Sequence, residues 1–150
     1  MIKEFKGKWA ALSNFEPCLI LYKGIVYPST EHAFMSAKNE SPEWKEACAN
    51  TGFTCGQIKR KGRKIDLVPE WDSIKEQVML DVNTVKYSKE PYSSYLLSTG
   101  TQYIEEGNRW GDKIWGVCLK TGIGDNLLGK VLMKIRKKHQ YEKESAKNYL

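Results

Sequence analysis

The hydrophobic and polar positions of this chain follow two different periods. Residues 18–29 contain two short apolar runs separated by Lys23 and Gly24, which predicts a β-hairpin. Residues 71–89 instead repeat apolar side chains every three or four positions, which is the period of an amphipathic helix. The repeated positions in that segment are Ile74, Val78, Val82 and Val85.

Capping residues mark the remaining predicted helices. Ser29 or Thr30 can cap a helix that continues to Lys38, and Ser41, followed by Pro42, can cap a second one. Further helices are expected at residues 54–64, 91–100 and 126–138. In the last of these, the side chains expected to face inward are Leu128, Val131, Leu132 and Ile135.

Strand signals are fewer than helix signals. Besides the hairpin, residues 112–120 are rich in β-forming residue types and predict one more strand. There is no βαβ alternation, no repeat and no break in composition. We therefore predict an α+β fold, a single compact, mostly helical domain over residues 1–150 with a small β-sheet.

Composition narrows the class of protein. The 150 residues are 41% hydrophobic and 28% charged, which is typical of a globular protein, and no apolar run is long enough for a membrane helix. The N-terminus lacks the apolar region of a signal peptide, so we expect a cytoplasmic protein without a membrane partner. The four cysteines include no CxxC pair, which argues against a metal site.

The net charge of +6 suits a phosphorylated or polyanionic partner. The basic residues concentrate in residues 57–64 and in a basic helical tail, residues 138–150. Solvated helix faces would explain both segments as well. Nothing in the sequence indicates an oligomeric state.

The first candidate site is the helix that contains Glu31 and Lys38. On a helix these two residues and Met35 share one face. Glu31 could act as a general acid or base, and Lys38 could bind phosphate or form an imine. The alternative is an exposed, salt-bridged helical turn.

The second candidate is the segment over residues 105–116, which combines carboxylates, glycines and two tryptophans. Glu106 and Asp112 beside Trp110 and Trp115 have the surroundings that raise a carboxyl pKa, and the indoles could stack on a base. Two further candidates are weaker. Lys59, Arg63 and Trp71 could hold a phosphorylated sugar and its base, or they could belong to a basic surface helix. Asn126 is most simply explained as a helix N-cap.

Several motifs occur together in an order that resembles one family, the NADAR (NAD- and ADP-ribose-associated, YbiA-like) proteins. The likeness covers about residues 5–137. The motifs are LSNF (12–15), YPSTEHAFMSAK (27–38), IKRKGR (58–63), VPEWDSIKEQVM (68–79), KY (86–87), LLSTG (96–100), EEGNRWGDKIWG (105–116) and GDNLLGKVLMKIR (124–136).

The resemblance implies a YbiA-like α+β fold and an N-glycosidase, a hydrolase of N-glycosyl bonds. Members of the family cleave phosphoribosylamino-pyrimidine intermediates of riboflavin synthesis or remove ADP-ribose from guanine in nucleic acid, so both substrates and nucleic acid itself are candidate partners. No cofactor and no metal are implied.

Carried over residue by residue, the resemblance implies catalytic roles for Glu31, Lys38, Glu106 and Asp112. It implies substrate contacts from Asn14, Phe15, His32, Lys59, Arg63, Trp71, Trp110, Trp115, Gly116 and Asn126. His32 follows Glu31 directly, so on a helix it points elsewhere. Many members have Gln at Met35, and the loop between Glu106 and Trp115 is longer here, which leaves the substrate subclass open.

Two chemical routes remain open. Paired carboxylates could protonate the leaving base and stabilise the oxocarbenium ion, or Lys38 could form a Schiff base with a ring-opened ribosylamine. A different class of function, a non-catalytic module that binds ADP-ribose or nucleic acid, would use the same positive charge and aromatic side chains. Several carboxylates near a phosphorylated ligand favour catalysis over binding alone.

Overall fold

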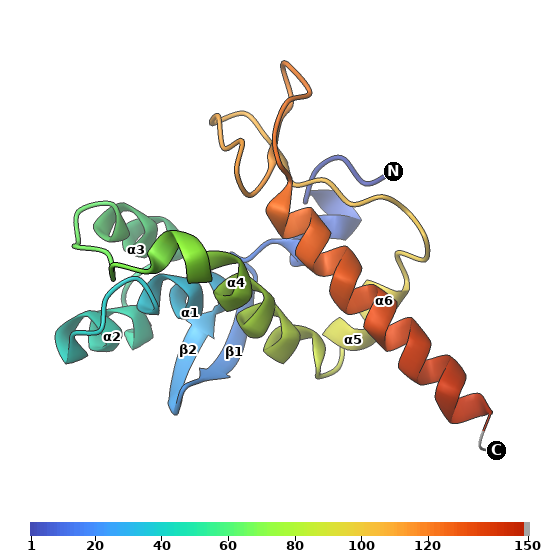
Figure 1. The fold of residues 1–150 in the computed structure, drawn as a ribbon, viewed down its shortest axis with the longest axis horizontal. Coiled ribbons are helices and arrows are strands. Elements are labelled where there is room, and N and C mark those ends of the chain that lie inside the picture. The colour runs from blue at the N-terminus through green and yellow to red at the C-terminus, as the bar shows by residue number, and fades with distance from the viewer. Residues whose placement is uncertain (149–150) are drawn as a thin grey trace. The chain divides into compact units, whose positions relative to one another are not determined.

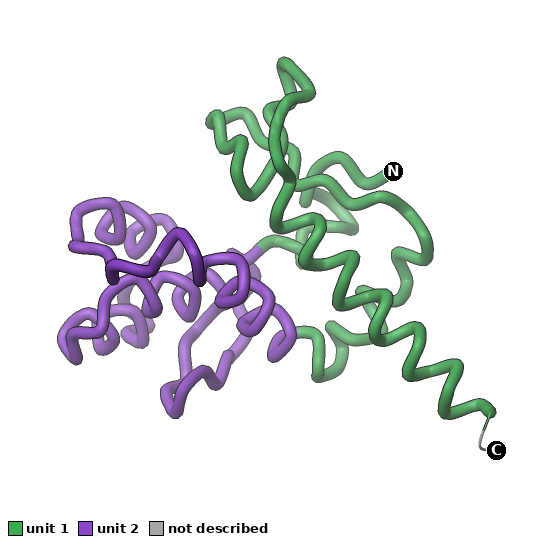
Figure 2. The backbone as a smooth tube through the Cα atoms, viewed as in Figure 1, with its two compact units in different colours: residues 1–13, 87–150 green, residues 14–86 purple. Residues whose placement is uncertain are grey.

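The computed structural model describes residues 1–148, and the chain divides into two compact units (Figure 2). One unit comprises residues 14–86, and the other combines residues 1–13 with the chain from residue 87 onward. The last two residues of the predicted basic tail, 149 and 150, lie outside the described residues. The composition does not change at either boundary, which is why the sequence predicts one domain, and that remains a prediction.

The unit over residues 14–86 begins with the predicted hairpin, which is confirmed. Strand β1 (Pro17–Tyr22) pairs antiparallel with β2 (Ile25–Ser29). The two residues between them, Lys23 and Gly24, have φ values of 49° and 82°. Positive φ at both central positions is the requirement of a type I′ turn, whose twist matches that of the paired strands.

One face of the hairpin is buried against helix α1 (Thr30–Ser36) (Figure 1). On β1 the side chains of Cys18, Ile20 and Tyr22 are buried, and the residues between them are exposed. All seven residues of α1 are buried. This helix is too short to be stable alone, so its stability comes from packing against the hairpin and against helices α2 and α3.

Three further helices complete this unit, and each lies close to its predicted range. Helix α2 (Pro42–Ala49) is capped by Ser41, and α3 (Cys55–Gly62) is capped by Thr54 in a reciprocal capping box with Gln57. Helix α4 (Trp71–Tyr87) buries the predicted Val78 and Val82. The predicted helical content of this unit is therefore confirmed.

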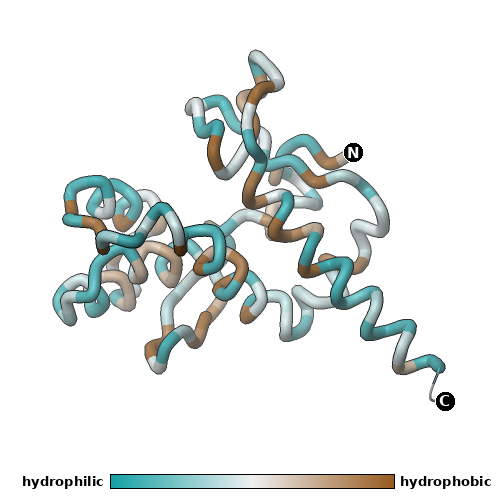
Figure 3. The backbone as a smooth tube through the Cα atoms, in the orientation of Figure 1, coloured by the Kyte–Doolittle hydropathy of each residue, from teal (hydrophilic) through white to brown (hydrophobic). Residues whose placement is uncertain are grey.

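The other unit contains the 3₁₀ helix η1 (Gly7–Leu12), helix α5 (Tyr92–Leu97) and the long helix α6 (Leu127–Lys147). The predicted inward residues of α6 are buried, and Figure 3 shows apolar segments along its first turns and mainly hydrophilic ones near its end. Within α6, the Arg136 guanidinium donates hydrogen bonds to the Thr99 hydroxyl and the Gln102 carbonyl, both at 2.8 Å. No helix within residues 1–148 is long and apolar enough to cross a membrane.

The strand predicted over residues 112–120 is largely wrong. Only β4 (Val117–Cys118) is extended, and it pairs in parallel with β3 (Gly107–Asn108). The reason is local, because the Asp112 carboxylate accepts hydrogen bonds from the backbone N–H groups of Ile114 and Trp115, at 3.0 and 2.9 Å. Those bonds form a turn that an extended strand cannot contain.

Asn126 occupies the predicted N-cap position of α6, but its side chain does not cap the helix. Its backbone is left-handed, with φ of 54°. Its amide group donates to the Ile104 carbonyl at 2.8 Å, and its amide oxygen accepts from the Glu106 backbone N–H at 3.0 Å. Gly129 leaves the space this amide needs, because a β-carbon there would collide with Asn126 and with Ile104.

We expect the Asn126→Ala variant to lose about 2–5 kcal/mol of unfolding free energy. Two buried hydrogen bonds contribute about 0.5–1.5 kcal/mol each, and alanine in a left-handed conformation costs about 1–2 kcal/mol. Asn126→Gly tolerates the conformation and should lose only the hydrogen-bond part. Urea unfolding measures both, with Asn148→Ala in the exposed last turn as the control. Wild-type stability of Asn126→Ala would contradict this account.

Candidate active site

The start of α1 holds Glu31 in a buried position. Glu31 is 6% exposed, and its backbone N–H donates to the Asn14 carbonyl at 3.1 Å. The Thr30 hydroxyl lies 3.0 Å from the same carbonyl and 3.1 Å from the side-chain oxygen of Asn14. The Asn14 amide then donates to the Met79 sulfur at 3.2 Å. Asn14 therefore connects the first turn of α1 to helix α4.

His32 is held by the protein at both ring nitrogens. Its Nε2 lies 2.7 Å from the Phe53 carbonyl, which can only accept, so Nε2 carries the proton. Its Nδ1 then accepts from the Ser29 hydroxyl at 2.7 Å, and the Cys55 sulfur lies 3.3 Å from that hydroxyl. This geometry favours a structural role for His32 at the start of α1 over the predicted substrate contact.

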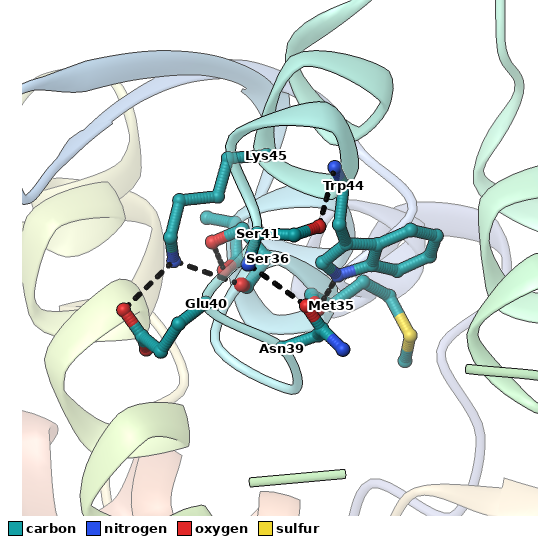
Figure 4. A network of polar contacts seen from close by, with 8 residues as sticks. Met35, Ser36, Asn39, Glu40, Ser41, Trp44 and Lys45 are labelled. Atoms are coloured by element: carbon teal, nitrogen blue, oxygen red, sulfur yellow. Dashed lines mark hydrogen bonds and ion pairs between the residues drawn. The ribbon is translucent and has the colours of Figure 1, made fainter. Parts of the chain in front are cut away.

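The end of α1 is fixed by two side chains of α2 (Figure 4). The Trp44 indole N–H donates to the Met35 carbonyl at 2.8 Å, and the Lys45 ammonium donates to the Ser36 carbonyl at 3.1 Å. In a continuing helix those carbonyls would accept backbone N–H groups four residues later. The helix therefore ends at Ser36, and the prediction that it continues through Lys38 is wrong.

Lys38 lies in the turn that follows α1, and its side chain is half-buried. Its carbonyl accepts the Val68 N–H at 2.8 Å, and its ammonium lies 5.8 Å from the centroid of the Trp71 ring. Burial lowers the pKa of Lys38, and the positive charges of Lys59 and Arg63 lower it further, while the negative charge of Glu31 opposes them.

Four predicted site residues lie close together in the unit over residues 14–86, because three of them act electrostatically on the fourth. The charges of Glu31, Lys59 and Arg63 act on Lys38. A buried amine whose pKa is lowered has more of its neutral, nucleophilic form near neutral pH than an exposed lysine. The arrangement can therefore combine a nucleophilic amine, a carboxyl group and two cations.

The two aromatic side chains predicted for this unit differ in exposure. Trp71 is 7% exposed and packs against Phe34, with ring centroids 5.2 Å apart. Phe15 is 45% exposed, and the Lys59 ammonium lies 5.9 Å from its ring centroid. Phe15 is therefore better placed than Trp71 to contact a planar base.

A second group of predicted residues belongs to the other unit and is centred on Asn108. Its amide donates to the Glu106 carboxylate at 3.1 Å and to the Asp112 carbonyl at 2.9 Å, and its oxygen accepts the Asp112 N–H at 3.0 Å. A β-carbon at Gly116 would collide with the Glu106 carboxylate. Glycine is therefore required at residue 116 for Glu106 to occupy this position.

The remaining predicted residues of this unit differ in what they can offer a ligand. The Asp112 carboxylate is used by the turn over residues 112–115. Trp110 is 67% exposed and Trp115 is half-buried, so Trp110 offers the larger stacking surface. Asn126 holds Ile104 and Glu106 through its side chain. Within residues 1–148 there is no group of three or more His, Cys, Asp or Glu side chains that could hold a metal ion.

Three residues that organise these groups were not identified from the sequence. The sequence predicts Thr30 only as a possible helix cap, and it assigns no site role to Met79 or Asn108. A tertiary hydrogen bond that a hydroxyl donates or a thioether accepts cannot be recognised from a periodic pattern in the sequence. Asn108 carries one usable signal, since Gly-Asn between carboxylates is typical of a turn in which the Asn side chain bonds the backbone.

Comparison with known proteins assigns the family. The chain matches the NADAR domain over residues 3–140. It is 38% identical to an N-glycosidase of Acanthamoeba polyphaga mimivirus over 97 residues, which cover 56% of each chain. It is 29% identical to a riboflavin biosynthesis protein of Vibrio vulnificus over 86% of this chain and 35% of that protein. The chain thus spans about half, or less, of these two relatives.

A relative of similar length gives the fold as well. The chain is 28% identical to N-glycosidase YbiA of Escherichia coli, over 87% of this chain and 82% of that protein. The NMR structure of E. coli YbiA superimposes with a TM-score of 0.83, covering 95% of this chain and 87% of that one. The predicted α+β, YbiA-like fold with much helix and small sheets is thereby confirmed, and the chain belongs to the NADAR family.

Proposed function

We propose that this protein is an N-glycosidase that hydrolyses the bond between a base and ribose in an N-ribosyl substrate. The observation that carries the proposal is buried Glu31, whose charge acts on half-buried Lys38, together with the pKa of Lys38, which burial lowers. The names of two of its relatives, the N-glycosidases of the mimivirus and of Escherichia coli, support the same activity.

The lowered pKa of Lys38 favours the imine route over purely carboxylate catalysis. The sugar ring opens when the nitrogen lone pair forms a C=N bond and the ring oxygen takes a proton. The neutral Lys38 amine adds to C1, and the base then leaves as an amine after its nitrogen is protonated. Water adds to the lysine imine and releases the sugar aldehyde, which restores Lys38.

Glu31 is the proposed proton carrier for these steps. It is buried, and its charge acts on Lys38, so it can take the proton that Lys38 loses on attack and return it to the leaving nitrogen. Of the two catalytic carboxylates predicted for the other unit, Asp112 already serves two backbone N–H groups, whereas Glu106 accepts a hydrogen bond from the Asn108 amide.

The cations and aromatic side chains indicate the shape of the substrate. Lys59 and Arg63 would bind a phosphate on the sugar, and exposed Phe15 of the same unit would contact the base. The riboflavin-related name of the Vibrio relative supports a phosphoribosylamino-pyrimidine. ADP-ribosylated guanine in nucleic acid is the second proposed substrate, and the net charge of +6 supports it.

We expect the wild-type protein to release free base from an N-riboside 5′-phosphate, or free ADP-ribose from ADP-ribosylated guanine DNA. Glu31→Gln should lower kcat by about 10²–10⁴-fold because it removes the proton carrier. Glu43→Gln, an exposed carboxylate of α2, is the matched control and should keep the wild-type rate. Chromatography of the released base or ADP-ribose measures the activity of all three proteins.

Two outcomes would contradict the proposal at different points. Tight binding of both substrates without any released base or ADP-ribose would support a non-catalytic binding module instead. Full activity of Glu31→Gln would leave the N-glycosidase proposal standing but remove Glu31 from its mechanism.

The pH dependence of kcat should change when a charged residue near Lys38 is replaced, because that charge affects the pKa of Lys38. In the imine route kcat rises with pH as the Lys38 ammonium loses its proton. Removing a positive neighbour, as in Lys59→Gln or Arg63→Gln, favours the ammonium and raises the pKa of Lys38, so the rising limb should move to higher pH. Lys61→Gln removes an exposed charge from the same helix and should leave the limb unchanged. A shift to lower pH, or an equal shift in Lys61→Gln, contradicts the assignment.

A further inference from the structure

One face of α6 carries a stripe of exposed lysines that the proposed hydrolysis does not use. Lys130, Lys134 and Lys137 recur at intervals of four and three, and Tyr141 follows four residues later. These intervals place the four side chains on one face of the helix, with Lys138 beside them. All five are exposed, and we call this set the α6 basic stripe.

The charge on this helix is segregated in an unusual way. From Leu127 to Tyr141 the helix has five basic residues and no acidic one, and the first carboxylate is Glu142. Only Arg136 among the five is buried, where it bonds Thr99 and Gln102. A merely solvated helix face usually interleaves charges of both signs, as α4 does with its Asp72–Lys75 pair.

The stripe also lowers the stability of its own helix. Lys130, Lys134 and Lys138 are spaced four apart, and like charges at that spacing repel each other. The first turns of a helix carry the positive end of its dipole, which disfavours cations there. None of the stripe lysines forms an ion pair with a carboxylate of residues 1–148. A bound polyanion would relieve each of these unfavourable interactions.

The spacing of the stripe and its aromatic end indicate the kind of polyanion. Lys130 and Lys138 are about 12 Å apart along the helix axis, so their ammonium groups can follow several successive phosphates. Tyr141, at the end of the stripe, is 71% exposed. A flat aromatic surface beside a track of cations is how proteins bind a single strand, because an unpaired base can stack on the ring.

We propose that the α6 basic stripe binds single-stranded nucleic acid, through phosphate contacts by its lysines and base stacking on Tyr141. This binding does not depend on the N-glycosidase activity. A failure of the binding proposal would leave the hydrolysis of a free N-riboside untouched, and the converse also holds.

The test compares two double variants of equal net charge. Lys134→Gln with Lys138→Gln removes two stripe lysines, whereas Lys143→Gln with Lys147→Gln removes two exposed lysines elsewhere on the same helix. Fluorescence anisotropy with a labelled, mixed-sequence 15-nucleotide DNA strand gives Kd over a range of salt concentrations. Loss of two phosphate contacts should weaken binding about 20-fold at 0.1 M salt and reduce the salt slope by about 1.4. The control double variant should bind almost as the wild type does.

Two additional variants sharpen the result. Lys134→Glu should abolish the repulsion at this position and raise Tm by about 1–3 °C while it weakens binding, a pairing of effects that damage to the fold would not produce. Tyr141→Ala should weaken single-strand binding about fivefold or more and leave duplex binding unchanged.

Three results would overturn the proposal. They are the absence of salt-dependent binding by the wild type, equal weakening by the two double variants, and duplex DNA that competes as well as the single strand. RNA of the same sequence serves as a parallel probe, and stronger binding of RNA than of DNA would still support the stripe.

Discussion

The candidate site depends on two hydrogen bonds at the end of α1. Trp44 and Lys45 donate them to the carbonyls of Met35 and Ser36. They stop the helix at Ser36, and the chain turns so that the Lys38 N–H bonds the Met35 carbonyl while the Lys38 carbonyl takes the Val68 N–H. In that turn the ammonium lies near the Trp71 ring. If α1 continued through Lys38, helical geometry alone would set the position of this side chain, and these tertiary hydrogen bonds would be absent.

Hydrogen bonds also fix the start of α1. Ser29 caps the helix, and Asn14 receives both the Glu31 N–H and the Thr30 hydroxyl. A helix of seven buried residues has little stability of its own, so these bonds and the surrounding packing fix the distance between Glu31 and Lys38. The site therefore depends on tertiary contacts at both ends of one short element, which accounts for the electrostatic coupling of the two side chains.

Much of this architecture follows from local sequence. The hairpin is encoded by Lys23 and Gly24, and the caps Ser41 and Thr54 each mark a helix start. The features that the sequence does not encode locally are long-range. The early end of α1 depends on side chains of α2, and the role of Asn126 depends on Ile104, 22 residues away. The turn at Asp112 shows the same limit, because β-forming residue types there are overridden by one carboxylate that bonds two N–H groups.

The nucleophilic role proposed for Lys38 depends on its half-buried position in the turn after α1. Sodium borohydride added during turnover, followed by mass spectrometry of tryptic peptides, tests it most directly. We expect the sugar to be trapped on the peptide that contains Lys38, and we expect Lys38→Gln to trap nothing and to lose activity. Continued turnover with no trapped sugar, together with an unchanged rate for Lys38→Gln, would contradict it.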